Sequence, residues 1–227
     1  MTATARSRDL RALGGVLFAV FFIASLVLGG ALASDSLPLP GAPATEVAGY
    51  FTESRTAVLV SGLLQVLSAI SLSVFALCIV AFVRRMAGEM GALPGLTLGG
   101  GAFAAVFLLA SALLAWVLAL TAAGLGLDLV STLRDLNFLF GGGAHVVSLG
   151  LFVGATSIAA LRAKTLPRWI PWLGIVAAAL SILSLTSLVF FPATILLPLG
   201  RLLSFVWSIA VGLVLALGKQ REPGAGG

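Results

Sequence analysis

His145 is the one histidine in this chain, and it lies well inside an apolar stretch. If a membrane helix begins near Leu136, the helical rise places His145 about 15 Å from the outer surface. An ionisable residue at that depth is by default a candidate functional residue, and the glycines at 141–143 leave room for a ligand. It could carry a proton or donate a hydrogen bond to a buried head group. We favour the alternative, a neutral imidazole bonded across a helix pair, because one histidine without partners is not a mechanism.

Three arginines lie at the outer ends of predicted membrane helices: Arg55, Arg134 and Arg201. Guanidinium groups pair well with phosphate and carboxylate, so the three could converge on an anionic ligand. Asp135 and Glu53 could pair with them instead. For each arginine alone, snorkelling to the interface with local ion pairs is the simpler interpretation. Arg201 is the strongest candidate, because its neighbours in the sequence include the fewest polar residues.

Gln65 shares one helical face with Ser61 and Ser68, at spacings of four and seven residues. Such a stripe could line a polar pathway. More often these residues form interhelical hydrogen bonds, worth about 0.6 kcal/mol each, and we favour that role. The predicted ligand-binding residues are therefore His145, Arg201, Arg55, Arg134, Asp135 and Gln65.

Several classes of chemistry are disfavoured by the residues present. One cysteine, Cys78, allows neither an internal disulfide nor a thiol zinc site, and one histidine cannot form a zincin pair. No phosphate-binding glycine loop and no Gly-x-Ser-x-Gly elbow occurs. We assign no catalytic residue and no metal ligand, and we expect no cofactor. An intramembrane protease using a serine with His145 stays open.

The elements that position these residues are predicted to be membrane helices. Hydrophobic residues make up 60% of the 227 positions and charged residues 9%, where a soluble domain carries about a quarter charged. The apolar runs are continuous and about twenty residues or longer, which favours helices over the short alternating strands of a barrel. We predict an all-α bundle, one membrane domain with six transmembrane helices, at about 12–33, 56–83, 96–123, 136–161, 170–191 and 199–217.

The basic residues predict the orientation, with both termini in the cytoplasm of a multi-pass protein of the inner (cytoplasmic) membrane. Membrane topology explains the net charge of +5, so we expect no nucleic-acid partner. A signal-peptidase site at 31–33 would instead leave five spans, but the preceding apolar stretch is longer than usual for a signal peptide. The basic residues on the predicted inner side are Arg6, Arg8, Arg11, Arg84, Arg85, Arg162, Lys164, Arg168, Lys219 and Arg221.

The longest predicted connection, about 34–55, opens with three prolines that favour an extended path. Apolar residues then recur at helical spacing, which predicts a short amphipathic helix at about 44–54, lying in the outer interface with Tyr50 as its anchor. The alternative is a disordered loop. The polar, glycine-rich tail at 222–227 is expected to be disordered.

Two stretches are similar to a known family. One runs from Ala44 to Gly62 and contains Arg55, and the other is the turn from Lys164 to Gly174. On these stretches the chain resembles the bacterial membrane-protein family catalogued as domain of unknown function 4386. The resemblance implies six helices. It adds no catalytic residue, because that family has no established activity.

Three classes of function fit these observations. The first, which we favour, is a non-enzymatic helical bundle that binds a lipid, an apolar small molecule or a partner membrane protein. The second is a small transporter or channel, which would need a water-accessible path and broken helices near mid-membrane. The third is a membrane enzyme acting on a lipid or isoprenoid, which would need convergent ionisable groups. Membrane lipids are the expected partners in each case.

Overall fold

The computed structural model describes residues 9–86 and 91–219, apart from the side chains of Leu188 and Phe191. The predicted disordered tail lies outside these residues. Within them the chain is helical and contains no strand. The α-helices are α1 (Gly14–Leu32), α2 (Ala44–Glu53), α3 (Arg55–Met86), α4 (Leu93–Thr121), α5 (Leu127–Leu139), α6 (His145–Ala163), α7 (Trp169–Leu183) and α8 (Leu196–Ala216).

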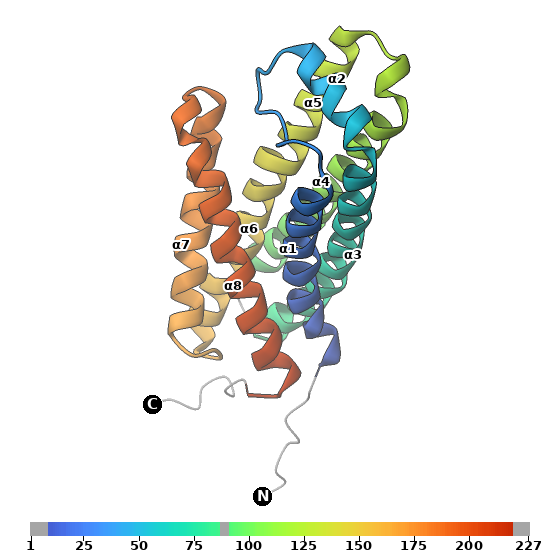
Figure 1. The fold of residues 1–227 in the computed structure, drawn as a ribbon. Coiled ribbons are helices and arrows are strands. Elements are labelled where there is room, and N and C mark those ends of the chain that lie inside the picture. The colour runs from blue at the N-terminus through green and yellow to red at the C-terminus, as the bar shows by residue number, and fades with distance from the viewer. Residues whose placement is uncertain (1–8, 87–90, 220–227) are drawn as a thin grey trace, which may run out of the picture.

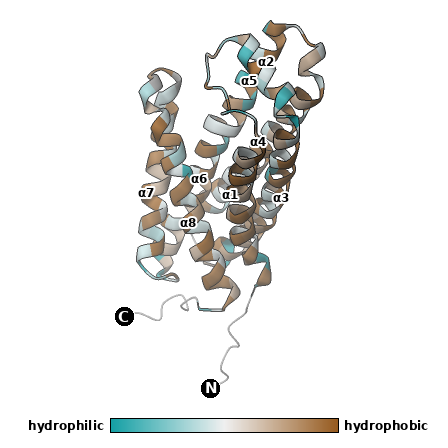
Figure 2. Ribbon diagram, viewed as in Figure 1, coloured by the Kyte–Doolittle hydropathy of each residue, from teal (hydrophilic) through white to brown (hydrophobic). Residues whose placement is uncertain are grey.

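Six helical segments are long and apolar enough to cross a membrane, which confirms the predicted all-α fold with six such helices. Apolar residues cover the length of these helices (Figure 2), and many large ones are exposed. The chain is thus compatible with an integral, multi-pass membrane protein. The six segments are Leu10–Leu32, Arg55–Met86, Leu93–Gly124, Leu127–Ala163, Trp169–Ser187 and Pro192–Ala216.

The six spans form a ring in which α1, α3, α4, α6, α7 and α8 each pack on the next, and α8 returns to α1 (Figure 1). Large aromatic side chains fill the space inside this ring of helices. Trp207 meets Phe75 and Phe152 edge to face, with centroids 6.3 and 5.9 Å apart. Glycines allow close helix contact elsewhere, as where Gly100 lies against the backbone of Phe152.

The first and last described residues lie at the same end of the bundle. The amide of Asp9 donates to the carbonyl of Leu215, and that of Lys219 to the carbonyl of Val214. We call this the termini end; the opposite end, which carries α2, is the α2 end (Figure 1). An even number of spans accounts for this arrangement. Which end faces the cytoplasm stays a prediction.

Helix α2 forms close to its predicted place, but it packs on protein. Val47 and Phe51 are buried in a small apolar cluster with Leu118 of α4 and Val130 of α5. The predicted anchor Tyr50 is partly buried and meets the Phe51 ring edge to face at 5.4 Å. The apolar face of α2 therefore packs on α4 and α5, and its position in the outer membrane interface stays a prediction.

Three spans depart from their predicted bounds by more than three residues, and the sixth does so by beginning at Pro192 instead of near 199. The fourth begins at Leu127, before the predicted start near 136, and its added first turns include Arg134, whose side chain is buried. The fifth leaves α-helical geometry at Ser184, before its predicted end at 191, and a 3₁₀ turn at Phe191–Ile195 leads into α8. Pro198 fits the first turn of α8, because backbone N–H groups there have no helical acceptor.

Candidate functional site

A pocket of about 300 Å³ lies in the half of the bundle nearest the α2 end. Its walls come from α1, α3, α4, α5 and α8, together with the loop between α1 and α2. The volume falls at the lower limit of small-molecule sites. Most of the lining is apolar. Its polar side chains include Gln65, Ser111, Arg134, Asn137 and Arg201.

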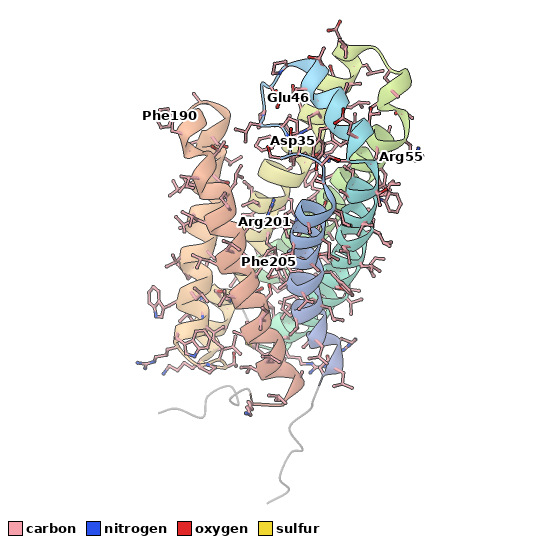
Figure 3. All side chains as sticks on the ribbon, viewed as in Figure 1. Asp35, Glu46, Arg55, Phe190, Arg201 and Phe205 are labelled. Atoms are coloured by element: carbon pink, nitrogen blue, oxygen red, sulfur yellow. The ribbon has the colours of Figure 1, made fainter. Side chains whose placement is uncertain are left out.

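Arg201 reaches into the pocket from α8 (Figure 3). Its Nη2 donates to the carbonyl oxygen of Gly141, and its guanidinium carbon lies 4.8 Å from the centre of the Phe22 ring. Both contacts are ones a guanidinium favours, the second through the negative ring face. The buried Nε has no hydrogen-bond partner among the described residues. Part of the donor capacity of Arg201 is therefore unused.

Arg134 enters the same pocket from α5 and is 5% exposed. Its Nη2 donates to the carbonyl of Pro38 at 2.8 Å, and its guanidinium carbon lies 6.0 Å from the Phe138 ring centre. Its Nε also lacks a partner among the described residues. On α2, burial raises the pKa of the partly buried Tyr50 phenol, while the positive charge of Arg134 acts in the opposite direction.

Neither pocket arginine has a carboxylate partner among the residues that the structure describes. Across residues 9–86 and 91–219 the one salt bridge joins Arg11 to Asp9, at the termini end. Asp135 follows Arg134 in the sequence but is exposed and does not line the pocket. A cation removed from water without an opposite charge is costly. The charge of Asp135 acts on Arg134 from outside the pocket, but no carboxylate of the described ranges lines the pocket itself. Two arginines in one cavity therefore make the pocket electrostatically suited to an anion.

A π-helical segment, Phe140–Ala144, forms the pocket wall beside Arg201. Glycines at 141–143 account for it, because they favour regular α-helix least among residues other than proline. Because the helix is irregular here, the carbonyl oxygen of Gly141 is free to accept a hydrogen bond from Arg201. A Cβ added at Gly141 would overlap the hydroxyl of Ser111. Ser111 is itself fixed, donating to the Asn137 carbonyl at 3.0 Å while the Asn137 side chain donates to the Ser111 carbonyl at 2.6 Å.

His145 lies behind the pocket and does not line it. It is fully buried, and its Nδ1 is 2.8 Å from the carbonyl oxygen of Ala104 on α4. A carbonyl only accepts, so Nδ1 carries the proton and Nε2 presents a lone pair, which finds no partner among the described residues. The Phe22 ring lies parallel to the imidazole, with centroids 6.4 Å apart. This geometry matches the interhelical bond that we favoured from the sequence.

Of the remaining predicted ligand-binding residues, one lines the pocket and one does not. Gln65 lines the pocket from α3, whereas Arg55 is exposed at the start of α3 and lies outside it. The sequence analysis did not single out Asn137 or Phe22, which the pocket also uses. An asparagine inside an apolar span was an available signal. No local signal distinguishes Phe22 from the other thirteen phenylalanines.

The two serines of the polar stripe on α3 both make hydrogen bonds to backbone carbonyls. The Ser61 hydroxyl donates to the carbonyl of Ala57 in its own helix, and that of Ser68 donates to the carbonyl of Phe18 on α1, both at 2.8 Å. These are the local and interhelical bonds expected of membrane serines. Of the stripe, Gln65 alone reaches the pocket.

Comparison with family models, with curated proteins and with solved structures gives no match for this chain. The resemblance to domain of unknown function 4386 therefore stays a prediction.

Proposed function

We propose that this protein is a non-enzymatic membrane bundle that binds an anionic amphiphile in the pocket at the α2 end. In this proposal Arg134 and Arg201 hold the anionic group. The α2 end faces outward, and both termini lie in the cytoplasm beside the cytoplasmic membrane. The observation that carries the proposal is the pair of arginines in one cavity. Within the described part of the chain, the Nε of each has no hydrogen-bond partner and neither arginine has a carboxylate partner.

The polar groups of the pocket suit an anion with several oxygens. Guanidinium donors from α5 and α8 and the Gln65 amide from α3 line one cavity, and together they suit a phosphate or carboxylate. The other walls, including Leu108, Phe138 and Leu197, suit an apolar portion of the same molecule. Phosphate or carboxylate attached to hydrocarbon is thus the ligand class that the pocket fits best.

An enzymatic function and a transport function each have less support than binding. The ionisable side chains that line the pocket are both arginines, which are poor proton carriers because they stay protonated. Transport would need a path past Phe22 and His145, which are almost completely buried. A cysteine placed at 145 tests this alternative. Labelling by a water-soluble reagent would favour a transporter, and complete protection would count against one.

Native mass spectrometry in mild detergent tests the binding proposal, with dodecyl phosphate as the probe. Arg201→Gln and Arg134→Gln should each weaken binding by about tenfold or more, because a hydrogen bond to a charged group contributes about 1.5–3 kcal/mol. Arg55→Gln is the matched control, since it removes an exposed arginine from the same end. Equal affinity in wild type and all three variants would contradict the proposal.

Folding defects are separated from binding defects by Arg201→Lys. This variant keeps the positive charge but loses the planar fork of donors, so it should bind with intermediate affinity. Each variant is first compared with wild type for monodispersity and helicity. A variant that passes both checks and still binds poorly has lost the site rather than the fold.

A further inference from the structure

We place the opening of the pocket at its side, between α1 and α8, because its exposed lining residues lie on these two helices and on the loop between α1 and α2. Its rim includes Leu26 of α1, Leu37 of the α1–α2 loop and Pro198 of α8, and all three are exposed. Leu26 and Leu37 are 57% and 53% exposed, whereas Arg134 at the back of the pocket is 5% exposed. The outer part of α8 stands apart from α1, with Arg201 on the facing side (Figures 1 and 3).

This opening follows from how the two helices pack. Near the termini end they are very close, because Gly15 lies against the Ser208 carbonyl and Gly212 against that of Ala12; a Cβ at either would come within 2.6 Å of the oxygen. Farther along, Phe22 and Arg201 fill the space between them. Beyond that contact, the exposed side chains of Leu26 and Pro198 border the pocket.

Two of the three rim residues belong to segments that could cross a membrane. Leu26 belongs to the span Leu10–Leu32 and Pro198 to the span Pro192–Ala216. From Leu26 to the end of α1, the helical rise is about 9 Å. An apolar rim at this depth faces hydrocarbon chains rather than water.

The α1–α2 loop covers the pocket from the α2 end. Pro38 is buried and accepts a hydrogen bond from Arg134. The loop is fixed at its start as well, where the amide of Ser34 donates to the Ser54 hydroxyl at 3.0 Å. A molecule arriving from water at this end would meet the loop, whereas a molecule arriving from the bilayer would meet the side opening.

We infer that the ligand is an anionic lipid of the leaflet at the α2 end, which enters sideways between α1 and α8. Its head group reaches Arg134 and Arg201, and its acyl chains remain in the leaflet past Leu26 and Pro198. This inference rests on the proposed function, because it takes the two arginines as the anion site. The competing source of the same chemistry is a water-soluble phosphate or carboxylate.

Photocrosslinking in nanodiscs of phosphatidylcholine doped with phosphatidylglycerol tests the inference. A photoreactive phenylalanine analogue replaces either Leu26, at the rim, or Val27, the next residue. Val27 is 62% exposed and does not line the pocket, so it samples bulk lipid. We expect phosphatidylglycerol adducts at 26 to be enriched about tenfold over those at 27, and Arg201→Gln to remove the enrichment.

A second arm measures binding of glycerol phosphate, which carries the charged group without acyl chains, to wild type and to Arg201→Gln. Enrichment of phosphatidylglycerol at 26 that depends on Arg201, with weak binding of glycerol phosphate, supports the sideways route. Arg201-dependent binding of glycerol phosphate without lipid enrichment overturns the route and leaves the anion site standing. Failure of both probes, and of dodecyl phosphate, overturns the route together with the proposed function.

Discussion

Arg134 and Arg201 are held by backbone carbonyls rather than by carboxylates. Arg201 donates to Gly141 and Arg134 to Pro38, and each bond uses one of several guanidinium donors. A carbonyl satisfies a donor without neutralising the charge. Each arginine is thereby oriented while its positive charge stays available to an anion, an arrangement that favours binding without a large rearrangement of the site.

Gly141 and Gly143 provide a matched test of the pocket wall. Gly141→Ala should destabilise the protein by about 1–3 kcal/mol, because the new methyl group overlaps the fixed Ser111 hydroxyl. Gly143→Ala meets no atom within 4 Å, so it should be neutral or stabilise by about 0.5–1 kcal/mol through helix propensity. Unfolding in detergent measures both. Equal effects of the two substitutions would show that the Ser111 contact does not restrict this segment.

At the scale of elements, α2 and the start of α5 share an apolar cluster that is separate from the aromatic core around Trp207. That cluster contains Val47 and Phe51 of α2 and Val130 of α5, and it packs on Leu118 of α4. Local opening of a small cluster requires less free energy than global unfolding. The α2 cap can therefore loosen while the six spans stay packed, and the loop over the pocket would loosen with it.

Phe51→Ala tests this separation. Removing a buried phenylalanine should destabilise the cap by about 3–5 kcal/mol, so hydrogen exchange should accelerate in α2 and in the preceding loop but not in α7 or α8. Thr52→Ala is the control: the residue is exposed and bonds only within its own helix, so its effect should stay within about 0.5 kcal/mol. Faster exchange throughout the bundle after Phe51→Ala would mean that the cap and the spans unfold together.

At the scale of the whole molecule, the pocket lies between helices that have little direct contact with each other. A ligand between Arg134 of α5 and Arg201 of α8 would connect these two helices. Binding should accordingly raise the stability of the bundle as a whole and not that of the cap alone.

Thermal unfolding with and without dodecyl phosphate measures this connection. At a probe concentration a hundred times its Kd, mass action predicts about 2.7 kcal/mol of added stability. Dodecyl maltoside, which has the same chain and no charge, should give no specific stabilisation. Arg55→Gln should retain the stabilisation and Arg134→Gln should lose most of it. The same increase in all proteins would indicate a general detergent effect and contradict site binding.

The sequence by itself determined the six apolar helices and the short helix α2. Both depend on local properties: a run of apolar residues long enough to span a bilayer, and apolar residues repeating at the helical period. It also identified three residues of the pocket, Gln65, Arg134 and Arg201, because polar and charged side chains are conspicuous in an apolar chain.

Tertiary structure alone decided which of those residues meet. Arg55 and Arg134 look alike in the sequence, yet one is exposed and the other lies in the pocket. Helices that are apolar on every face carry little information about their rotation. Here glycine contacts, the π-helical segment and the placement of Phe22 set that rotation. These are relations between residues far apart in the chain, so local periodicity could not contain them.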